Sequence, residues 1–479
     1  MKRPIAMPLS LLHCASGALS ARGMHSRPTV LQLADDLAAG RVSSRSLVDE
    51  AFANIERPDG EGSRAFMKLY QETARAEADA SDQLRRSGVT RSVVEGIPIS
   101  VKDLFDVAGD VTRAGSRALE HAPAARWDAP AVARLRAAGA VIVGRTTTVE
   151  FAFGGLGLNP HYGTPRNPYD RQAARIPGGS SAGAAVAVAD GMCAVSIGSD
   201  TRGSVRIPSA LCGLVGFKPT QARVPRTGVF PLSQTLDSIG PLGNSVACCA
   251  IFDSILSGAT GSDVVAPAAL PAAGLRLCVP RCSVMGSLDP LVASAFARAT
   301  AALRAAGAAV VEVDAPMMDR AQALFKDGGF AGPEAARVHR QLLKTHAAVY
   351  DPRVASRIVL GESFSAVDYI QLFDDRAEVI AQAGALLAPF DAMVYPTTAT
   401  TAPTISEVDA SDAEYAKWNL RLLHNTGLIN MLDGCAATVP CHAPEEPPIG
   451  ISIAGMGGSD ARILAVAQTV ETVLKDITG

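Results

Sequence analysis

The sequence has no strong excess of charge of either sign, few aromatic residues and no long uninterrupted apolar run. Its 479 residues carry a formal net charge of only −3, so nothing electrostatic points to nucleic acid as a partner. The longest weakly polar run, 182–198, is interrupted by Asp190 and Gly191 and is too short for one membrane-spanning helix. We therefore expect a soluble cytoplasmic protein without a nucleic-acid or membrane partner.

The cysteines lack the spacing of a metal site. They number nine, an odd count, and are scattered mostly through apolar runs, which indicates reduced structural thiols. Neither Cys278 with Cys282 nor Cys435 with Cys441 has a second C-x2-C pair or an H-x3-H element beside it. We predict no metal.

Apolar residues and glycine are abundant instead. The hydrophobic content of 48% and the 43 glycines indicate a folded protein in which helices pack closely on strands. Residues 1–23 superficially copy a secretory signal, but Pro8 and His13 break the apolar stretch, and Met24 offers a second start. We interpret 1–23 as a mis-set start or an unstructured leader rather than an export signal.

Helix and strand patterns alternate along most of the chain. A helical pattern over 128–139 precedes an apolar strand at 140–144, and the same order recurs at 289–307 and 308–313. Such alternation is typical of parallel strands joined by helices. We predict an α/β fold with a large mixed, mainly parallel β-sheet covered by helices on both faces.

The rest of the pattern fits one large domain. Two amphipathic helices are expected at 29–39 and 45–55, and a strand at 449–455 precedes a final helix at 459–474. Residues 316–390 are rich in helical pattern and charge and poor in strand signals. We predict a single domain over 24–479 with a helical cap inserted at 316–390.

Two serine-rich stretches carry the candidate chemistry. The first, 177-PGGSSAGAAVAVADG-191, places serines at the start of a helix, and the second, 198-GSDTRGSVRIPS-209, follows a strand. Backbone N–H groups at a glycine-rich turn or helix start can stabilise an oxyanion, so acyl transfer suits this arrangement. A G-x-S-x-G nucleophile elbow centred on Ser181 is the alternative, but the basic segment 171–177 precedes it instead of an apolar strand.

The proton acceptor for such a serine is not obvious. No histidine lies between His161 and His339, although a distant one such as His442 could fold in. Lys102, at the end of an apolar strand, is the remaining candidate, and it would need burial to lower its pKa by about three units from about 10.4. An ion pair with Asp103 or Asp106 is the structural alternative, and spacing does not decide between them.

Seven stretches, in order, resemble the amidase signature family of serine hydrolases, and the resemblance covers most of the chain from about residue 29. They are 96-GIPISVKD-103, 142-IVGRTTTVEFAFGG-155, 159-NPHYGTPRNPYD-170, 177-PGGSSAGAAVAVA-189, 198-GSDTRGSVRIP-208, 213-GLVGFKPTQARV-224 and 236-LDSIGPL-242.

The resemblance implies a catalytic triad without histidine. By matching motif, Lys102 is the base and Ser204 is the nucleophile. Ser180 relays the proton between them and is joined to Gly179 by a cis peptide bond. No cofactor is implied. The implied oxyanion hole consists of the backbone N–H groups of Thr201, Arg202, Gly203 and Ser204.

Further residues are candidates around this triad. Arg202 departs from the family, which commonly has glycine there, and we hypothesise that it narrows the pocket or contacts a polar or anionic substrate group; an arginine turned to solvent or paired with an acid is the alternative. Side chains that could hold the loops, with a plain turn role equally open, are Ser181, Asp200, Arg206 and Asp237. Pocket candidates besides Arg202, expected in 151–170 and 316–430, are Phe153, Leu158, Tyr395 and Trp418.

The sequence therefore predicts an amide hydrolase acting on a small carboxamide, aryl amide or carbamate through an acyl-enzyme at Ser204. Two alternatives stay open: the amidase component of a tRNA-dependent amidotransferase, and a non-catalytic binding protein of the same fold. A homodimer is compatible with the sequence.

Overall fold

The computed structural model describes residues 27–478, so the leader expected at 1–23 lies outside the described residues. The strands are β1 (Phe66–Leu69), β2 (Pro98–Lys102), β3 (Val141–Thr146), β4 (Val195–Asp200), β5 (Val215–Lys218), β6 (Ser238–Gly243), β7 (Arg276–Arg281), β8 (Ala309–Asp314), β9 (Ala392–Pro396), β10 (Cys435–Pro440) and β11 (Gly450–Gly455). The helices before β7 are α1 (Val30–Ala38), α2 (Ser44–Ile55), α3 (Gly62–Ala65), α4 (Gln71–Arg86), α5 (Pro130–Ala137), α6 (Ala182–Ala189), α7 (Arg206–Leu211) and α8 (Val246–Ser257). Those after β7 are α9 (Pro290–Ala305), α10 (Pro316–Ala323), α11 (Ala331–His346), α12 (Pro352–Leu360), α13 (Ala366–Leu387), α14 (Ile405–Val408), α15 (Asp412–Met431) and α16 (Asp460–Thr478).

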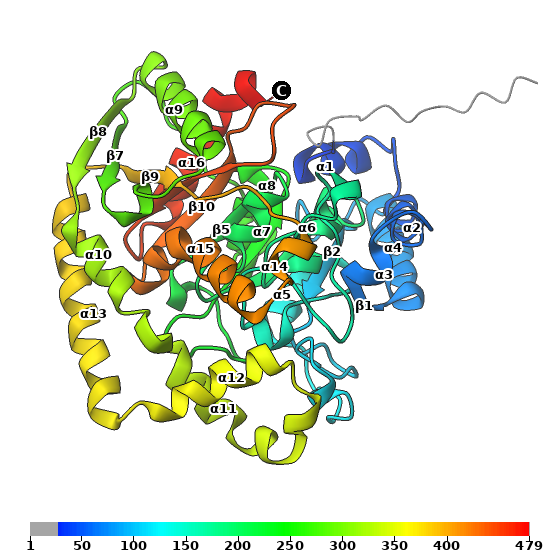
Figure 1. The fold of residues 1–479 in the computed structure, drawn as a ribbon. Coiled ribbons are helices and arrows are strands. Elements are labelled where there is room, and N and C mark those ends of the chain that lie inside the picture. Colours follow the sequence, from blue (N-terminus) through cyan, green and yellow to red (C-terminus); the bar gives the residue numbers. More distant parts are fainter. Residues whose placement is uncertain (1–26, 479) are drawn as a thin grey trace, which may run out of the picture.

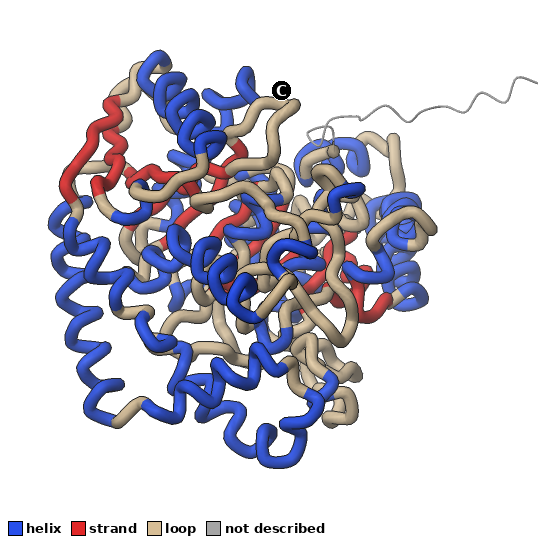
Figure 2. The backbone as a smooth tube through the Cα atoms, viewed as in Figure 1, coloured by secondary structure: helices blue, strands red, loops and turns tan. Residues whose placement is uncertain are grey.

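The strands form one sheet with β1 at one edge and β8 at the other (Figure 1). Their order is β1-β3-β2-β4-β6-β5-β10-β11-β9-β7-β8. Figure 2 shows helices around the strands, and the predicted α/β class with a large mixed sheet is confirmed. Strands β2 and β4 are parallel neighbours in this sheet, so their carboxyl ends lie side by side.

The expectation of mainly parallel pairing was wrong. Of the ten pairings, β2–β3, β2–β4, β7–β8 and β7–β9 are parallel and the other six are antiparallel. The parallel pairs lie in the two flanking parts, where helices connect the strands. The centre is built from β6, β5, β10 and β11, whose pairings with one another are all antiparallel.

Side-chain alternation divides the core between the two faces of the sheet. On β4, Val195 and Ile197 join an apolar cluster with α1, α5 and α8. On the neighbouring β6, Ile239 belongs to the same cluster, whereas Leu242 packs with α2, α4 and α6 in a second one. Helices thus cover both faces of this half of the sheet.

The helices expected at 29–39, 45–55, 128–139 and 289–307 are confirmed as α1, α2, α5 and α9. Thr29 and Ser43 cap α1 and α2 with capping boxes, and Pro130 and Pro290 begin α5 and α9. The segment 316–390 contains α10, α11, α12 and α13 and no strand, and in Figure 1 these helices lie along the left and lower margins. Val379 and Ala383 of α13 pack in a cluster with sheet residues, so this segment is joined to the main core.

Candidate active site

Three elements bring the predicted triad to one edge of the sheet. Lys102 is the last residue of β2, and Ser204 lies in the loop between β4 and α7. Because β2 and β4 are parallel neighbours, their carboxyl ends meet at the same edge. Ser180 precedes α6, which packs on both strands.

Lys102 is fully buried and contacts two hydroxyl groups. Its Nζ donates to Ser180 Oγ at 2.7 Å and to Ser199 Oγ at 2.9 Å. Burial lowers the pKa of Lys102 from 10.5 to about 7, although the charges of Asp200 and Asp237 act in the opposite direction. The alternative ion pair with Asp103 is absent, because Asp103 pairs with the buried Arg145 at 2.8 Å.

The segment around Ser180 is fixed against the Ser204 loop. The Gly179–Ser180 peptide is cis, as expected. The Ser181 N–H donates to the Ser204 carbonyl oxygen at 3.2 Å, while the Ser180 carbonyl oxygen accepts from the Thr148 hydroxyl at 3.0 Å. These bonds hold both serines within one small region.

A buried ion pair shapes the loop that carries Ser204. Arg206 Nη2 donates to Asp200 Oδ1 at 2.9 Å, and both side chains are fully buried. Burial acts to raise the pKa of Asp200, but Arg206 and further hydrogen bonds hold it well below its usual range. The Asp200 carboxylate also accepts from the Gly203 and Val205 N–H groups at 2.7 and 3.2 Å. Asp200 therefore stays ionised and closes the loop.

The hydrogen bond between Gly203 and Asp200 corrects one member of the predicted oxyanion hole. The N–H of Gly203 points at Asp200, so in this structure it does not face an incoming substrate oxygen. Gly203 itself has φ of +124°, and an added Cβ would lie 2.1 Å from Thr426 Oγ1. Thr201, Arg202 and Ser204 stay as predicted donors.

Asp237 supports the same loop from the other side. Its carboxylate accepts from Thr201 Oγ1 at 2.6 Å and from the N–H groups of Leu232 and Ser233 at 3.0 and 3.1 Å. Burial raises the pKa of Asp237 to about 6 despite these donors. Asp200 and Asp237 thus both contact the Ser204 loop, whereas Ser181 Oγ is buried without a hydrogen-bond partner among the described residues.

Ser204 opens onto a cavity of about 390 Å³. The volume suits a small organic substrate. Its walls come from the Ser204 loop, from 152–154, from 232–236 and from 325–423, so both segments expected to supply pocket residues, 151–170 and 316–430, contribute. The lining side chains used below are Phe153, Arg202, Phe325, Lys326, Asp327, Arg357, Leu420 and Leu423.

Three of the predicted pocket residues do not line this cavity. Leu158 packs in a separate apolar cluster with Ile176, and Trp418 lies half-buried against the same cluster. The residues of α15 that line the cavity are Asn419, Leu420 and Leu423 instead of Trp418. Tyr395 is fully buried within β9.

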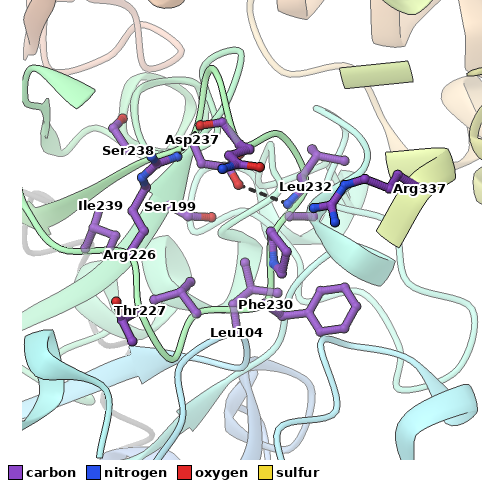
Figure 3. A pocket seen from close by; sticks show the side chains of 14 residues that line it. Leu104, Ser199, Arg226, Thr227, Phe230, Leu232, Asp237, Ser238, Ile239 and Arg337 are labelled. Atoms are coloured by element: carbon purple, nitrogen blue, oxygen red, sulfur yellow. Dashed lines mark hydrogen bonds between the residues drawn. The ribbon is translucent and has the colours of Figure 1, made fainter. Parts of the chain in front are cut away.

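A second cavity, of about 350 Å³, is lined by Ser199, one of the two hydroxyl partners of Lys102 (Figure 3). Ser199 and Asp237 line it, and Figure 3 shows Arg226 and Arg337 on opposite sides. Ala152 and Leu232 line both cavities, so the two adjoin. Ser199 is missed from the sequence because it shares one face of β4 with the apolar Val195 and Ile197, a pattern that predicts a residue facing the core.

The geometry disfavours two alternatives, a nucleophile elbow at Ser181 and a histidine base at His442. No strand leads directly into Ser181, as a nucleophile elbow requires, and His442 bonds with Ile449 after β10. Within residues 27–478, no cluster of three or more potential metal ligands occurs, and none of the described helices has the length and apolarity to cross a membrane.

Comparison with known proteins decides the family. The family model described as Amidase matches residues 47–464. The chain belongs to the amidase signature family. It is 36% identical to a 2-amino-5-chloromuconic acid deaminase of Comamonas testosteroni over 84% of this chain and 86% of that protein.

Two further proteins support the same family assignment. One component of the glutamyl-tRNA(Gln) amidotransferase of Roseiflexus castenholzii is 34% identical, over 93% of this chain and 95% of the relative. The crystal structure of an amidase superimposes with a TM-score of 0.83 at 31% identity, covering 93% of this chain and 100% of that one. This family member is therefore an amide-hydrolysing enzyme with the amidase fold.

Proposed function

We propose that the protein hydrolyses a small carboxamide, aryl amide or carbamate through an acyl-enzyme on Ser204. The observation that carries the proposal is the buried Lys102, whose pKa of about 7 leaves a large neutral fraction at neutral pH. Its contact with Ser180, beside the Ser204 loop, supports a relay between the nucleophile and the base.

In the proposed first half-reaction, neutral Lys102 accepts a proton from Ser180 as Ser180 takes the proton of Ser204. Ser204 Oγ attacks the substrate carbonyl carbon, and loop amides stabilise the oxyanion. The proton returns through Ser180 to the leaving nitrogen, and the C–N bond breaks. Ser199 has a positioning role, since an N–H of neutral Lys102 donated to Ser199 leaves the lone pair toward Ser180.

In the second half-reaction, water takes the place of the leaving amine. The same relay removes a proton from the water, which attacks the acyl carbon, and Ser204 regains its proton when the ester bond breaks. The cavity at Ser204 holds the acyl group, and 390 Å³ favours a small one.

The test is a hydrolysis panel of amides, carbamates and short esters with Lys102→Ala, Ser180→Ala and Ser204→Ala variants. Losing the base or the relay should lower kcat by about 10²- to 10⁴-fold. A serine-directed phosphonate should label the wild type and not Ser204→Ala. The matched control is Ser209→Ala, a fully buried serine whose Oγ donates to the Val205 carbonyl, which should keep the label.

The near-complete coverage of the glutamyl-tRNA(Gln) amidotransferase component supports one second candidate, an amidase that works within a complex. Amide hydrolysis by the purified chain alone favours the free-standing enzyme. Activity that appears only when partner proteins are added favours the second candidate. Absence of phosphonate labelling, in a chain with a normal circular dichroism spectrum, favours a binding protein.

A further inference from the structure

Arg202 projects an unpaired cation into the cavity that Ser204 lines. Its Nε is buried without a hydrogen-bond partner, and within the described part of the chain no ion pair involves its guanidinium. The central carbon of the guanidinium lies 4.0 Å from the centroid of the Phe325 ring. Neither alternative for this residue, exposure to solvent or pairing with an acid, describes its surroundings.

The position of Arg202 is fixed by its neighbours. Thr426 Oγ1 donates to the Arg202 carbonyl oxygen at 2.7 Å, which ties its backbone to α15. A Cβ at Gly427 would lie 2.9 Å from the Arg202 Cγ, so glycine at 427 makes room for the side chain. A guanidinium held this way is preorganised to receive a planar anion in two hydrogen bonds.

Most of the other charged side chains in the cavity wall are also positive. Lys326 and Arg357 also line it, against one acid, Asp327. Arg357 donates to the carbonyl oxygens of Phe153 and Arg353 and to the Tyr415 hydroxyl, all uncharged acceptors. The charged side chains of this concave site are thus mostly cationic, which raises the local concentration of anions.

Partial burial also removes part of the solvent from the cation of Arg202. It lowers the pKa of Arg202 to about 10, which still leaves the group charged at neutral pH. A partly buried cation without a hydrogen-bond partner at Nε is unfavourable, and a carboxylate from the substrate would satisfy it. Phe153, Leu420 and Leu423 supply apolar surface for a short carbon chain between the two polar ends.

We propose that Arg202 binds a carboxylate of the substrate, so that the preferred substrates are amides carrying a carboxylate on a short acyl chain. This rests on the amide hydrolysis proposed above. Arg202 and Ser204 lie close together in the chain, with only Gly203 between them, and both line one cavity, so the carboxylate and the scissile carbonyl belong to one small molecule.

The test compares half-amides of four- to six-carbon dicarboxylic acids with their diamides, which match them in shape and lack the charge. In the wild type, we expect kcat/KM about 10- to 100-fold higher for the half-amide, as for a hydrogen-bonded ion contact. Arg202→Met, which keeps length and contact with Phe325, should remove at least about tenfold of this ratio. Arg202→Lys should restore part of it, and Arg226→Met, in the adjoining cavity, should retain it.

A second readout needs no turnover. Short dicarboxylates should slow phosphonate labelling of wild-type Ser204 more than diamides of equal length, and Arg202→Met should abolish the difference. Equal protection by both, no protection by any dicarboxylate, or an unchanged ratio in Arg202→Met would overturn the inference. Absence of phosphonate labelling in the wild type would instead overturn the proposed hydrolysis.

Discussion

Lys102 shows what distinguishes a candidate base from an ordinary buried lysine. Lys218 is also fully buried, and burial lowers its pKa to about 8, but its Nζ donates only to the carbonyl oxygens of Pro219 and Gly434. Lys102 instead meets two hydroxyls. A lysine whose pKa falls from 10.5 to about 7 has lost about 5 kcal/mol of charged-state stabilisation. The low pKa alone is not a signature of catalysis, whereas its combination with hydroxyl partners is.

Titration of Lys102 should appear in the pH dependence of hydrolysis. A proton-accepting lysine works only when neutral, so kcat/KM should fall about tenfold per pH unit below an apparent pKa near 7. Asp237, whose pKa burial raises to about 6, would steepen the fall if its ionised form holds the Thr201 hydroxyl in place. Stopped assays from about pH 5 to 9 on one neutral amide measure this, and a flat profile across that range would exclude Lys102 as the base.

The sequence predicts the residues of the proposed triad through its motifs, but it does not predict which apolar side chains line the cavity. The residue types at 102, 180 and 204 follow from motif matches, and the structure brings Lys102 and Ser180 into contact. Leu158 and Trp418 are apolar and therefore candidates for the pocket, but the direction of an apolar side chain depends on packing between distant segments. The same holds for Phe325, whose place in the cavity depends on how α10 and α15 pack.

At the scale of elements, helix α15 anchors the loop between β4 and α7. Arg206 Nη1 donates to the Thr426 carbonyl oxygen at 2.9 Å, and Arg206 Nη2 donates to Asn430 Oδ1 at 2.6 Å. Asn430 Nδ2 in turn donates to Asp200 Oδ1 at 2.9 Å. One buried polar network thus joins β4, the loop that follows it and α15. Hydrogen bonds in such a network polarise and strengthen one another.

Removing Arg206 should therefore destabilise the whole protein. Arg206→Met leaves Asp200 charged and buried without its partner, which costs about 3–5 kcal/mol of the free energy of unfolding. Urea denaturation followed by circular dichroism measures the loss. The matched control is Arg281→Met, which removes an arginine exposed on β7 and paired with Asp314, and it should leave the urea midpoint unchanged. A midpoint for Arg206→Met close to that of Arg281→Met would show that the network contributes little.

At the scale of the whole molecule, local pattern predicted the elements better than their assembly. The helix-then-strand order at 128–144 and 289–313 correctly gave α5 with β3 and α9 with β8. Extending that order to the entire sheet was wrong, because β10 and β11 form an antiparallel pair that also joins β5 to β9. Which strands become neighbours across distant segments is decided by packing, and no local periodicity encodes it.

Four apolar clusters contain strand residues of the continuous sheet, and we expect these four to unfold together. The buried cysteines sample all four: Cys248 lies in one, Cys249 and Cys435 in the second, Cys193 in the third and Cys278 in the fourth. Burial raises the pKa of Cys193 and Cys278 to about 12, so these two thiols should react slowly with iodoacetamide at about pH 8 in the native protein.

We expect these five cysteines to become reactive at one common urea concentration, because each cluster shares strands of the same sheet with its neighbour. Pulsed alkylation across a urea series, with peptide mass spectrometry, gives a midpoint for each cysteine. Cys282 is only partly buried, and its pKa, which burial raises to about 11, lies below those of Cys193 and Cys278, so it should be labelled fastest of these thiols in the native protein and serves as the internal reference. A midpoint for Cys278 well below that of Cys193 would mean that the part of the molecule holding α10 and α13 unfolds separately from the part holding Lys102 and Ser204.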